Sequence, residues 1–122
     1  MPHATRSLRP FIGARDYDRS RAFYTELGFV EHVIDPSMSL FAIRDGLAFY
    51  LQRYYDKRWV ENTMLFLEVD DLEAWQADLH ERALTTRFPE VKLSAIKTWD
   101  WGRELFMHDP AGVLWHIGSF AG

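Results

Sequence analysis

The chain has 122 residues, of which 48% are hydrophobic and 16% aromatic, and its net charge is −4. This length allows one compact domain with a hydrophobic core and is too short for two ordinary domains. The absence of cysteine excludes disulfides, thiolate metal sites and a cysteine nucleophile, and the scattered basic residues argue against a nucleic-acid partner. No apolar run is long enough to cross a membrane, and the N-terminal residues lack a secretion signal pattern. We therefore expect a cytoplasmic protein with no membrane partner.

The first half of the sequence reads as a strand, a helix and three further strands. An apolar run from Leu8 ends at Asp16, and the next residues place Phe23 and Leu27 on one helical face before Gly28. Asp16 suits the helix N-cap because a short carboxylate accepts from the free amides of the first turn, and glycine is typical of a helix end. The segments FVEHVID, LFAIRD and LAFYLQR follow as strands.

The second half begins after a polar, aromatic connector at residues 54–62. Another apolar run ends at Asp70 and Asp71, and Leu72, Trp75 and Leu79 follow at helical spacing. Either aspartate could cap this helix. An irregular stretch is expected over residues 85–99, before the strands RELFMHD and VLWHIGSF.

The two halves correspond to each other. Alignment of their helix starts and hairpin turns places Tyr50 opposite His116, and Arg9 opposite Met64. We predict an α+β fold of two repeated βαβββ modules, residues 5–55 and 61–120, within a single domain spanning 1–122. The strands should form a cupped mixed sheet with the helices on its outer face.

Alternation divides the predicted strands into two faces. One face is apolar and should pack against the helices: Ile12, Ala14, Phe49, Leu51, Leu65, Leu67, Val69, Trp115 and Ile117. The other face is mixed: Arg9, Phe11, Gly13, Ala48, Tyr50, Gln52, Met64, Phe66, Glu68, Leu114, His116 and Gly118. A core would not hold this many polar groups, and a solvated face would not expose Phe11, Met64 and Phe66 together. We interpret the mixed face as the lining of a ligand cup, although a dimer interface has a similar composition.

Two stretches carry a resemblance to a known family. The sequence RDYDRSRAFYTELGF after the first strand, and WGRELFMHDPAGVLWHIG near the C-terminus, resemble the vicinal oxygen chelate superfamily. This superfamily includes glyoxalase I, extradiol dioxygenases, and fosfomycin and bleomycin resistance proteins. The resemblance covers nearly the whole chain and is strongest to the bleomycin resistance branch. It implies a homodimer, with the ligand cup completed across the two chains.

Metal-using members of this superfamily place one ligand on each of four strands. The corresponding residues here are Arg9, Tyr50, Met64 and His116. Arginine stays protonated, methionine is a soft ligand, and tyrosine coordinates poorly unless it is deprotonated. The resemblance therefore implies neither a bound metal nor another cofactor. His116 is then either a hydrogen-bonded structural residue or a ligand contact beside Tyr50.

The pair Trp99 and Trp101 lies just before a predicted strand. In the bleomycin-binding proteins that the sequence resembles, this region lines a ligand groove with aromatic rings. The two indoles could stack on a flat ligand, cap the edge of the sheet or pack across a dimer. Glu104 could attract a positively charged ligand, or it could be an ordinary solvated carboxylate.

These observations predict metal-independent binding of an aromatic small molecule that could carry positive charge, with a bleomycin-type antibiotic as the model ligand. No residue is predicted to be catalytic. The predicted contact residues are Arg9, Phe11, Tyr50, Gln52, Trp59, Met64, Phe66, Trp99, Trp101, Glu104 and His116. Two alternatives are a glyoxalase- or dioxygenase-like lyase or isomerase, and a binding module for an ordinary aromatic metabolite.

Overall fold

The computed structural model describes residues 3–121, and the ends of the predicted domain, residues 1, 2 and 122, lie outside the described residues. The first half contains β1 (Phe11–Gly13), α1 (Tyr17–Glu26), β2 (Val30–Asp35), β3 (Met38–Arg44) and β4 (Leu47–Gln52). The short helix α2 (Lys57–Val60) leads to the second half. This half contains β5 (Met64–Glu68), α3 (Leu72–Glu81), α4 (Leu84–Arg87), β6 (Lys92–Leu93), β7 (Lys97–Trp99), β8 (Gly102–His108) and β9 (Leu114–Phe120).

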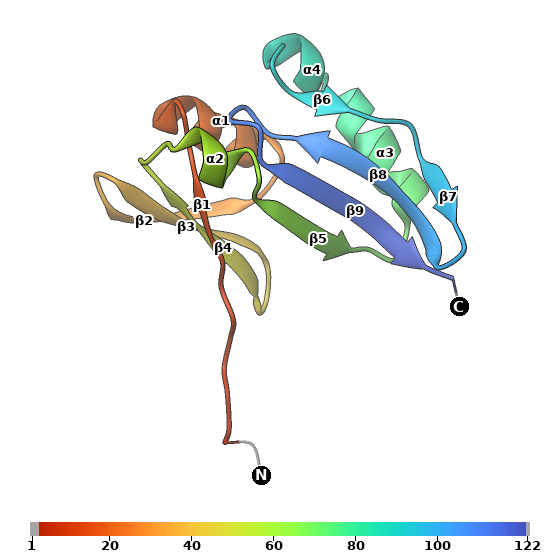
Figure 1. The fold of residues 1–122 in the computed structure, drawn as a ribbon, viewed down its shortest axis with the longest axis horizontal. Coiled ribbons are helices and arrows are strands. Elements are labelled where there is room, and N and C mark those ends of the chain that lie inside the picture. Colours follow the sequence, from red (N-terminus) through yellow and green to blue (C-terminus); the bar gives the residue numbers. More distant parts are fainter. Residues whose placement is uncertain (1–2, 122) are drawn as a thin grey trace.

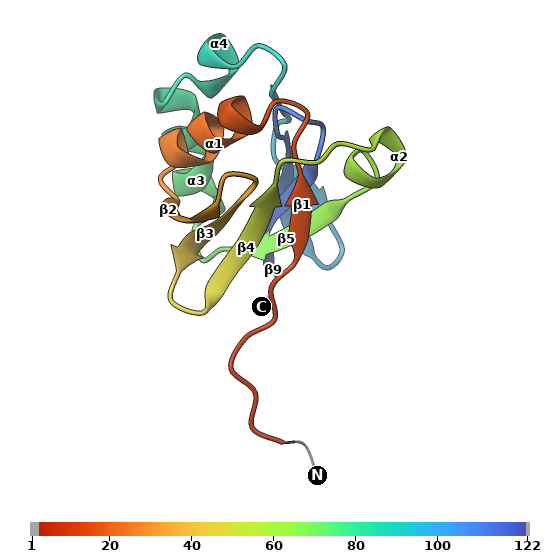
Figure 2. The ribbon, with the colours of Figure 1, turned by 90° about the vertical axis from the view of Figure 1, so that its left-hand side faces the viewer.

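The strands form two sheets that lie side by side (Figure 1). The first sheet has the order β1-β4-β3-β2, and the second has the order β5-β9-β8-β6 with β7 also beside β8. In each sheet the first strand of the half is parallel to the last, and the other pairs are antiparallel. Helices α1 and α3 lie on the same side of the two sheets (Figure 2). The α+β fold of two repeated modules is therefore confirmed.

Both long helices begin at the predicted aspartates. The side chain of Asp16 accepts from the backbone N–H of Arg19, and that of Asp71 accepts from Ala74. Of the two candidates for the second cap, Asp71 is thus the one used. Helix α1 ends before Gly28, whose φ of +101° lies in the left-handed region that glycine adopts without strain.

The strand register supports the alignment of the two halves. Phe11 of β1 pairs with Tyr50 of β4, and Phe66 of β5 pairs with His116 of β9. Because both the helix caps and these pairs match, Tyr50 and His116 occupy equivalent places in their modules.

The segment expected to be irregular, residues 85–99, was predicted incorrectly in part. It contains the end of α4 and the strands β6 and β7, and both strands pair with β8. These strands are only two or three residues long. Such short stretches have no readable alternation, so hydrogen bonding to β8, and not local pattern, defines them.

The core lies between the sheets and the helices α1 and α3. Phe23 and Leu79 from the helices are buried, as are Phe49 and Trp115 from the sheets. The apolar face predicted by alternation is thus the face that packs against the helices, with Leu65 and Val69 half-buried at its margin. No helix in the described part of the chain is long and apolar enough to span a bilayer.

Candidate functional site

The face of the second sheet that lies opposite the helices carries a buried carboxylate between two aromatic nitrogens. Glu104 is 6% exposed and lies on β8. Its Oε2 accepts from Nε1 of Trp99 at 2.8 Å, and its Oε1 lies 2.8 Å from Nδ1 of His116. Both oxygens therefore have a partner, so this buried acid is satisfied. Glu104 is not a solvated surface carboxylate.

This arrangement fixes the imidazole of His116. An ionised carboxylate can only accept hydrogen bonds, so with Glu104 ionised His116 carries a hydrogen on Nδ1. Nε2 is then the free ring nitrogen, and it has no hydrogen-bond partner among residues 3–121. His116 is thus hydrogen-bonded, as one of its two predicted roles requires, and still has one nitrogen available for a ligand.

Next to this pair, three exposed rings form what we call the aromatic platform: Phe66, Trp101 and Phe120. Their centroids lie 5.4 to 5.8 Å apart in each pair. They are 45%, 38% and 57% exposed, although rings of this size are usually buried. His116 extends the platform, because its ring is stacked on Phe66 at 6.3 Å. The platform is an exposed apolar surface of rings tilted against one another, beside a polar nitrogen.

A glycine allows these groups to approach one another. Gly118 of β9 pairs with Glu104 on one side and Glu68 on the other. A Cβ atom at this position would lie 3.0 Å from Cζ of Phe66 and 3.2 Å from Cβ of Glu104. The missing side chain therefore makes room for the edge of the platform and for the buried carboxylate.

The first sheet brings together another three of the predicted contact residues. The rings of Phe11 and Tyr50 are stacked at 4.6 Å, and Nη1 of Arg9 donates to the Tyr50 hydroxyl at 3.0 Å. Phe11 is 48% exposed. This group stands on the face that corresponds to the platform face of the second sheet.

The remaining predicted residues lie apart from these groups. Trp59 is on α2, where its ring packs near Tyr54 and against the bare backbone of Gly13. Met64 is 63% exposed at the start of β5. Gln52 is half-buried at the end of β4 and has no side-chain hydrogen bond among the described residues.

A narrow apolar slot joins the two sheets. It has a volume of about 170 Å³ and is lined by Leu8, Pro10, Ile43, Gly46, Leu47, Ala48, Phe49, Leu65, Phe66, Leu67 and Trp115. Phe66 therefore borders both the platform and this slot, and Pro10 brings the Arg9–Phe11 segment to the same slot.

Two rings of the site were not among the predicted contact residues. Phe120 completes the platform, and Phe106 meets His116 edge-on at 5.1 Å. Period-two alternation could have found both. Phe120 follows His116 and Gly118 on the same face of β9, and Phe106 follows Glu104 on β8.

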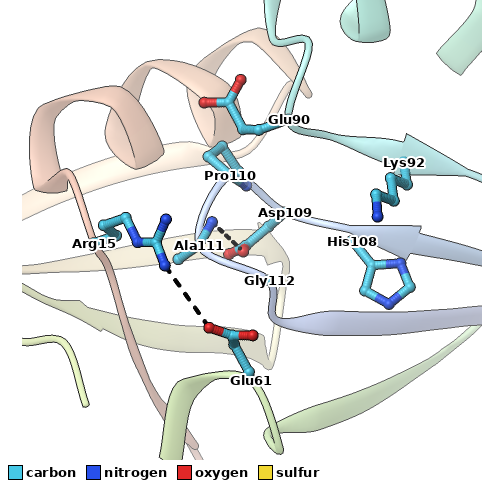
Figure 3. A pocket seen from close by; sticks show the side chains of 9 residues that line it. All are labelled: Arg15, Glu61, Glu90, Lys92, His108, Asp109, Pro110, Ala111 and Gly112. Atoms are coloured by element: carbon cyan, nitrogen blue, oxygen red, sulfur yellow. Dashed lines mark hydrogen bonds and ion pairs between the residues drawn. The ribbon is translucent and has the colours of Figure 1, made fainter. Parts of the chain in front are cut away.

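A second hollow, of about 450 Å³, lies at the β8–β9 turn (Figure 3). It is lined by Arg15, Glu61, Glu90, Lys92, His108, Asp109, Pro110, Ala111 and Gly112. Arg15 is paired with Glu61 and donates to Tyr55, and Glu90 is paired with Arg19. Since most of its charged groups are already paired, this hollow is a weaker candidate for ligand binding than the platform.

Asp109, at the same turn, is directed into the protein and is 1% exposed. Its carboxylate accepts from the Tyr24 hydroxyl at 2.6 Å and from the backbone N–H groups of Ala111 and Val113. Burial raises the pKa of this carboxyl to about 6, and these hydrogen bonds only partly oppose the rise. Trp115 donates to the same Tyr24 hydroxyl, so the network is part of the core.

No cluster of three or more His, Cys, Asp or Glu suited to a metal ion is found among residues 3–121. The four positions equivalent to the ligands of metal-using relatives are divided between the sheets. Arg9 bonds to Tyr50 and His116 bonds to Glu104, while Met64 is exposed.

Comparison with solved structures identifies the fold. A bleomycin-binding protein in complex with bleomycin is 22% identical, with a TM-score of 0.78 over 96% of this chain and all of that one. A bleomycin-binding protein from Streptomyces verticillus in complex with copper(II)-bleomycin is 21% identical, with a TM-score of 0.77 over 99% of this chain and all of that one. A glyoxalase/bleomycin resistance protein from Catenulispora acidiphila is 19% identical, with a TM-score of 0.77 over 96% of this chain and all of that one.

No protein-family model matches the sequence, and no curated protein matches it. The chain nevertheless has the fold of the bleomycin-binding and glyoxalase/bleomycin resistance proteins. The resemblance seen in its sequence motifs is confirmed at this level.

Proposed function

We propose that the chain binds an aromatic small molecule on the aromatic platform without a metal ion, with a bleomycin-type antibiotic as the model ligand. The observation that carries the proposal is the exposure of Phe66, Trp101 and Phe120 beside the Glu104–His116 pair. An aromatic ring that stacks on this surface gains about 0.5–1.5 kcal/mol beyond the burial of its area. The similarity in fold to two bleomycin-binding proteins supports this choice of model ligand.

In this proposal Glu104 is a positioning residue. Both of its oxygens are engaged by Trp99 and His116, so it does not offer a free carboxylate to a cationic ligand. It holds the Trp99 indole against β8 and directs the free Nε2 of His116. Ligand contact then falls to the rings of the platform, to Trp99 and to His116.

The test is a tryptophan fluorescence titration with bleomycin in the presence of EDTA, repeated with copper(II)-bleomycin. We expect quenching in both titrations. We also expect the Trp99→Ala, Trp101→Ala double variant to bind about tenfold more weakly or worse. Trp75→Phe is the matched control, because Trp75 lies on α3 away from the platform.

An unchanged bleomycin affinity in the double variant would remove stacking from the proposal. Binding that requires a metal ion supplied by the protein would remove metal independence. If bleomycin does not bind and an aromatic metabolite from a panel of cofactors and nucleosides does, the proposal of an aromatic ligand holds but that of a bleomycin-type antibiotic is wrong.

A second function is favoured by one specific observation. A carboxylate that orients an imidazole through Nδ1, leaving Nε2 free, is the arrangement of a general base. Metal-free acid–base catalysis at His116 would change the mass or the isomer of a bound compound. Chromatography and mass spectrometry of the recovered ligand, with His116→Gln as the control, separate catalysis from simple binding.

We also propose that the chain forms a homodimer. Large apolar side chains are exposed on the platform face and on the corresponding face of the first sheet, where Phe11 is 48% exposed. Monomers rarely expose contiguous apolar patches of this kind. Light scattering after size-exclusion chromatography should give the mass of two chains, and a monomer at micromolar concentration would contradict the proposal.

A further inference from the structure

The arginines of this protein fall into two groups. Most of them form ion pairs with Asp or Glu, namely Arg15, Arg19, Arg21, Arg82, Arg87 and Arg103. Arg6, Arg9, Arg44, Arg53 and Arg58 form no ion pair within residues 3–121. Because the chain as a whole has an excess of acidic residues, a set of unpaired arginines is unexpected.

Three of these five unpaired arginines, Arg6, Arg9 and Arg44, line the same pocket. It lies on the face of the first sheet opposite the helices and has a volume of about 540 Å³. Arg6 and Arg9 come from the extended segment before β1, and Arg44 comes from the end of β3. The hydrogen bond from Arg9 to Tyr50 ties this segment to β4.

The floor of the pocket is apolar. Alternating positions of three neighbouring strands supply Val30, Leu40, Ala42 and Ala48. The register places Val30 beside Ala42, and Ala42 beside Ala48, so these side chains form a continuous strip across the sheet. None of the four can pair with a guanidinium.

The charge in the pocket is unbalanced. Among the described residues that line it, three guanidiniums face a single carboxylate, Asp45, and His32 and Ser7 add further polar atoms. Walls of low dielectric around a concave pocket concentrate the field of such charges. An anion would therefore be attracted to this rim, and guanidinium is well suited to bind a carboxylate or sulfonate through paired hydrogen bonds.

We propose that this pocket is a binding site for small amphipathic organic anions, in which an acid group meets Arg6, Arg9 and Arg44 and an apolar body lies on the Leu40–Ala42–Ala48 floor. The site is distinct from the aromatic platform, which lies on the second sheet. It does not depend on the function proposed for that platform. It selects for negatively charged ligands, whereas the sequence suggested a ligand with positive charge.

The test uses three probes with the same ring system: 2-naphthoate, the neutral 2-naphthamide and the cationic 2-naphthylmethylammonium. Isothermal titration should show that naphthoate binds about tenfold more tightly than the amide or better, and the cation least tightly. Naphthoate affinity should fall as salt is raised. Amide chemical shifts should change at Leu40 and Ala42, and acetate and inorganic phosphate should bind weakly because they lack an apolar body.

Two charge-removing variants and two controls complete the experiment. Arg44→Gln and Arg6→Gln should each weaken naphthoate binding by about three- to tenfold. The control Arg58→Gln should leave naphthoate binding unchanged, because Arg58 lies on α2 outside the pocket. Arg58 is a suitable control because it too is exposed and forms no ion pair among the described residues. The Trp99→Ala, Trp101→Ala variant should retain naphthoate binding, which distinguishes failure of the platform proposal from failure of this one.

Equal affinity for the three naphthalene probes would overturn the proposal, as would equal losses in Arg44→Gln and Arg58→Gln. Phosphate binding as tight as that of naphthoate would contradict the role of the apolar floor. Shift changes confined to the platform residues would place the anion elsewhere and refute the assignment.

Discussion

The buried Asp109 should make the stability of this protein fall as the pH rises from about 4 to about 6. Its pKa is raised from 3.8 to about 6, chiefly by burial. A carboxyl with a raised pKa in the folded state binds a proton there at pH values where the unfolded chain has lost it. The folded state is therefore favoured at low pH, and this advantage disappears as the pH passes through 6.

The size of the effect follows from the two pKa values. A difference of one pKa unit corresponds to about 1.4 kcal/mol, so the shift from 3.8 to about 6 amounts to about 3 kcal/mol. Most of it, about 2–3 kcal/mol, should be seen between pH 7 and pH 4. Several carboxylates, such as Glu26 and Glu90, have a pKa lowered by hydrogen bonds from arginine, and their contribution has the opposite sign at still lower pH.

The substitution Asp109→Asn isolates this one group. Asparagine keeps an oxygen for the backbone N–H groups of Ala111 and Val113 but cannot titrate. The assay is urea unfolding of the wild type and the variant at pH 4, 5, 6 and 7. The free energy of unfolding of the wild type, minus that of the variant, should rise by about 2–3 kcal/mol from pH 7 to pH 4.

A matched control is Asp70→Asn, which changes an exposed carboxylate. If the Asp109→Asn difference changes no more with pH than the difference measured for this control, Asp109 is not a buried group with a raised pKa, and the account of the turn is wrong. A difference that grows with rising pH would show that its hydrogen bonds outweigh its burial.

Two further predictions concern the second sheet. Glu104→Gln keeps the shape of the side chain, but its amide oxygen can accept from only one of the two donors. Urea unfolding should therefore show that the free energy of unfolding falls by about 1–3 kcal/mol, and the bleomycin affinity should fall as well. An unchanged stability would mean that the bonds to Trp99 and His116 do not form in solution. Gly118→Ala places a Cβ atom 2.9 Å from the Arg103 carbonyl oxygen and should destabilise the fold by about 1–3 kcal/mol. A variant as stable as the wild type would show that β8 and β9 can separate freely at this position.

Strand alternation and helix caps were sufficient to predict most of the fold. They placed Asp16 at the start of α1, paired Tyr50 with His116 as equivalent positions, and put Trp115 in the core. Side chains on one strand face recur every two residues and those on one helix face about every four, so a short window of sequence is enough to detect either pattern. The correspondence of the halves then supplied the topology.

The chemistry of the site could not be predicted in the same way. The burial of Glu104 depends on β7 pairing with β8, which folds Trp99 back over a residue five positions later. The pairing of β7 is not readable from three residues. The unpaired arginines are similar: Arg6 and Arg44 are distant in sequence, and only the path of the segment before β1 brings both to one pocket.

The repeat itself shows how the two sheets acquired opposite chemistry. The alignment that matches Tyr50 with His116 also matches Gln52 with Gly118. On the neighbouring strand, Gln52 pairs with Met38 and Gly118 pairs with Glu104. The first module therefore has methionine where the second has the buried carboxylate. Without an acid on the neighbouring strand, the Tyr50 hydroxyl is hydrogen-bonded by Arg9, whereas His116 is held by Glu104.

The two modules therefore differ at this position by the presence of one carboxylate, which the second sheet has and the first lacks. The first sheet is left with arginines that lack carboxylate partners among the described residues, and the second has an acid whose two oxygens are both engaged. A first sheet that recognises anions and a second sheet that recognises flat rings are consistent with this difference. Because the two sheets meet at the slot between Pro10 and Phe66, a compound with an aromatic body and an acid group could contact both.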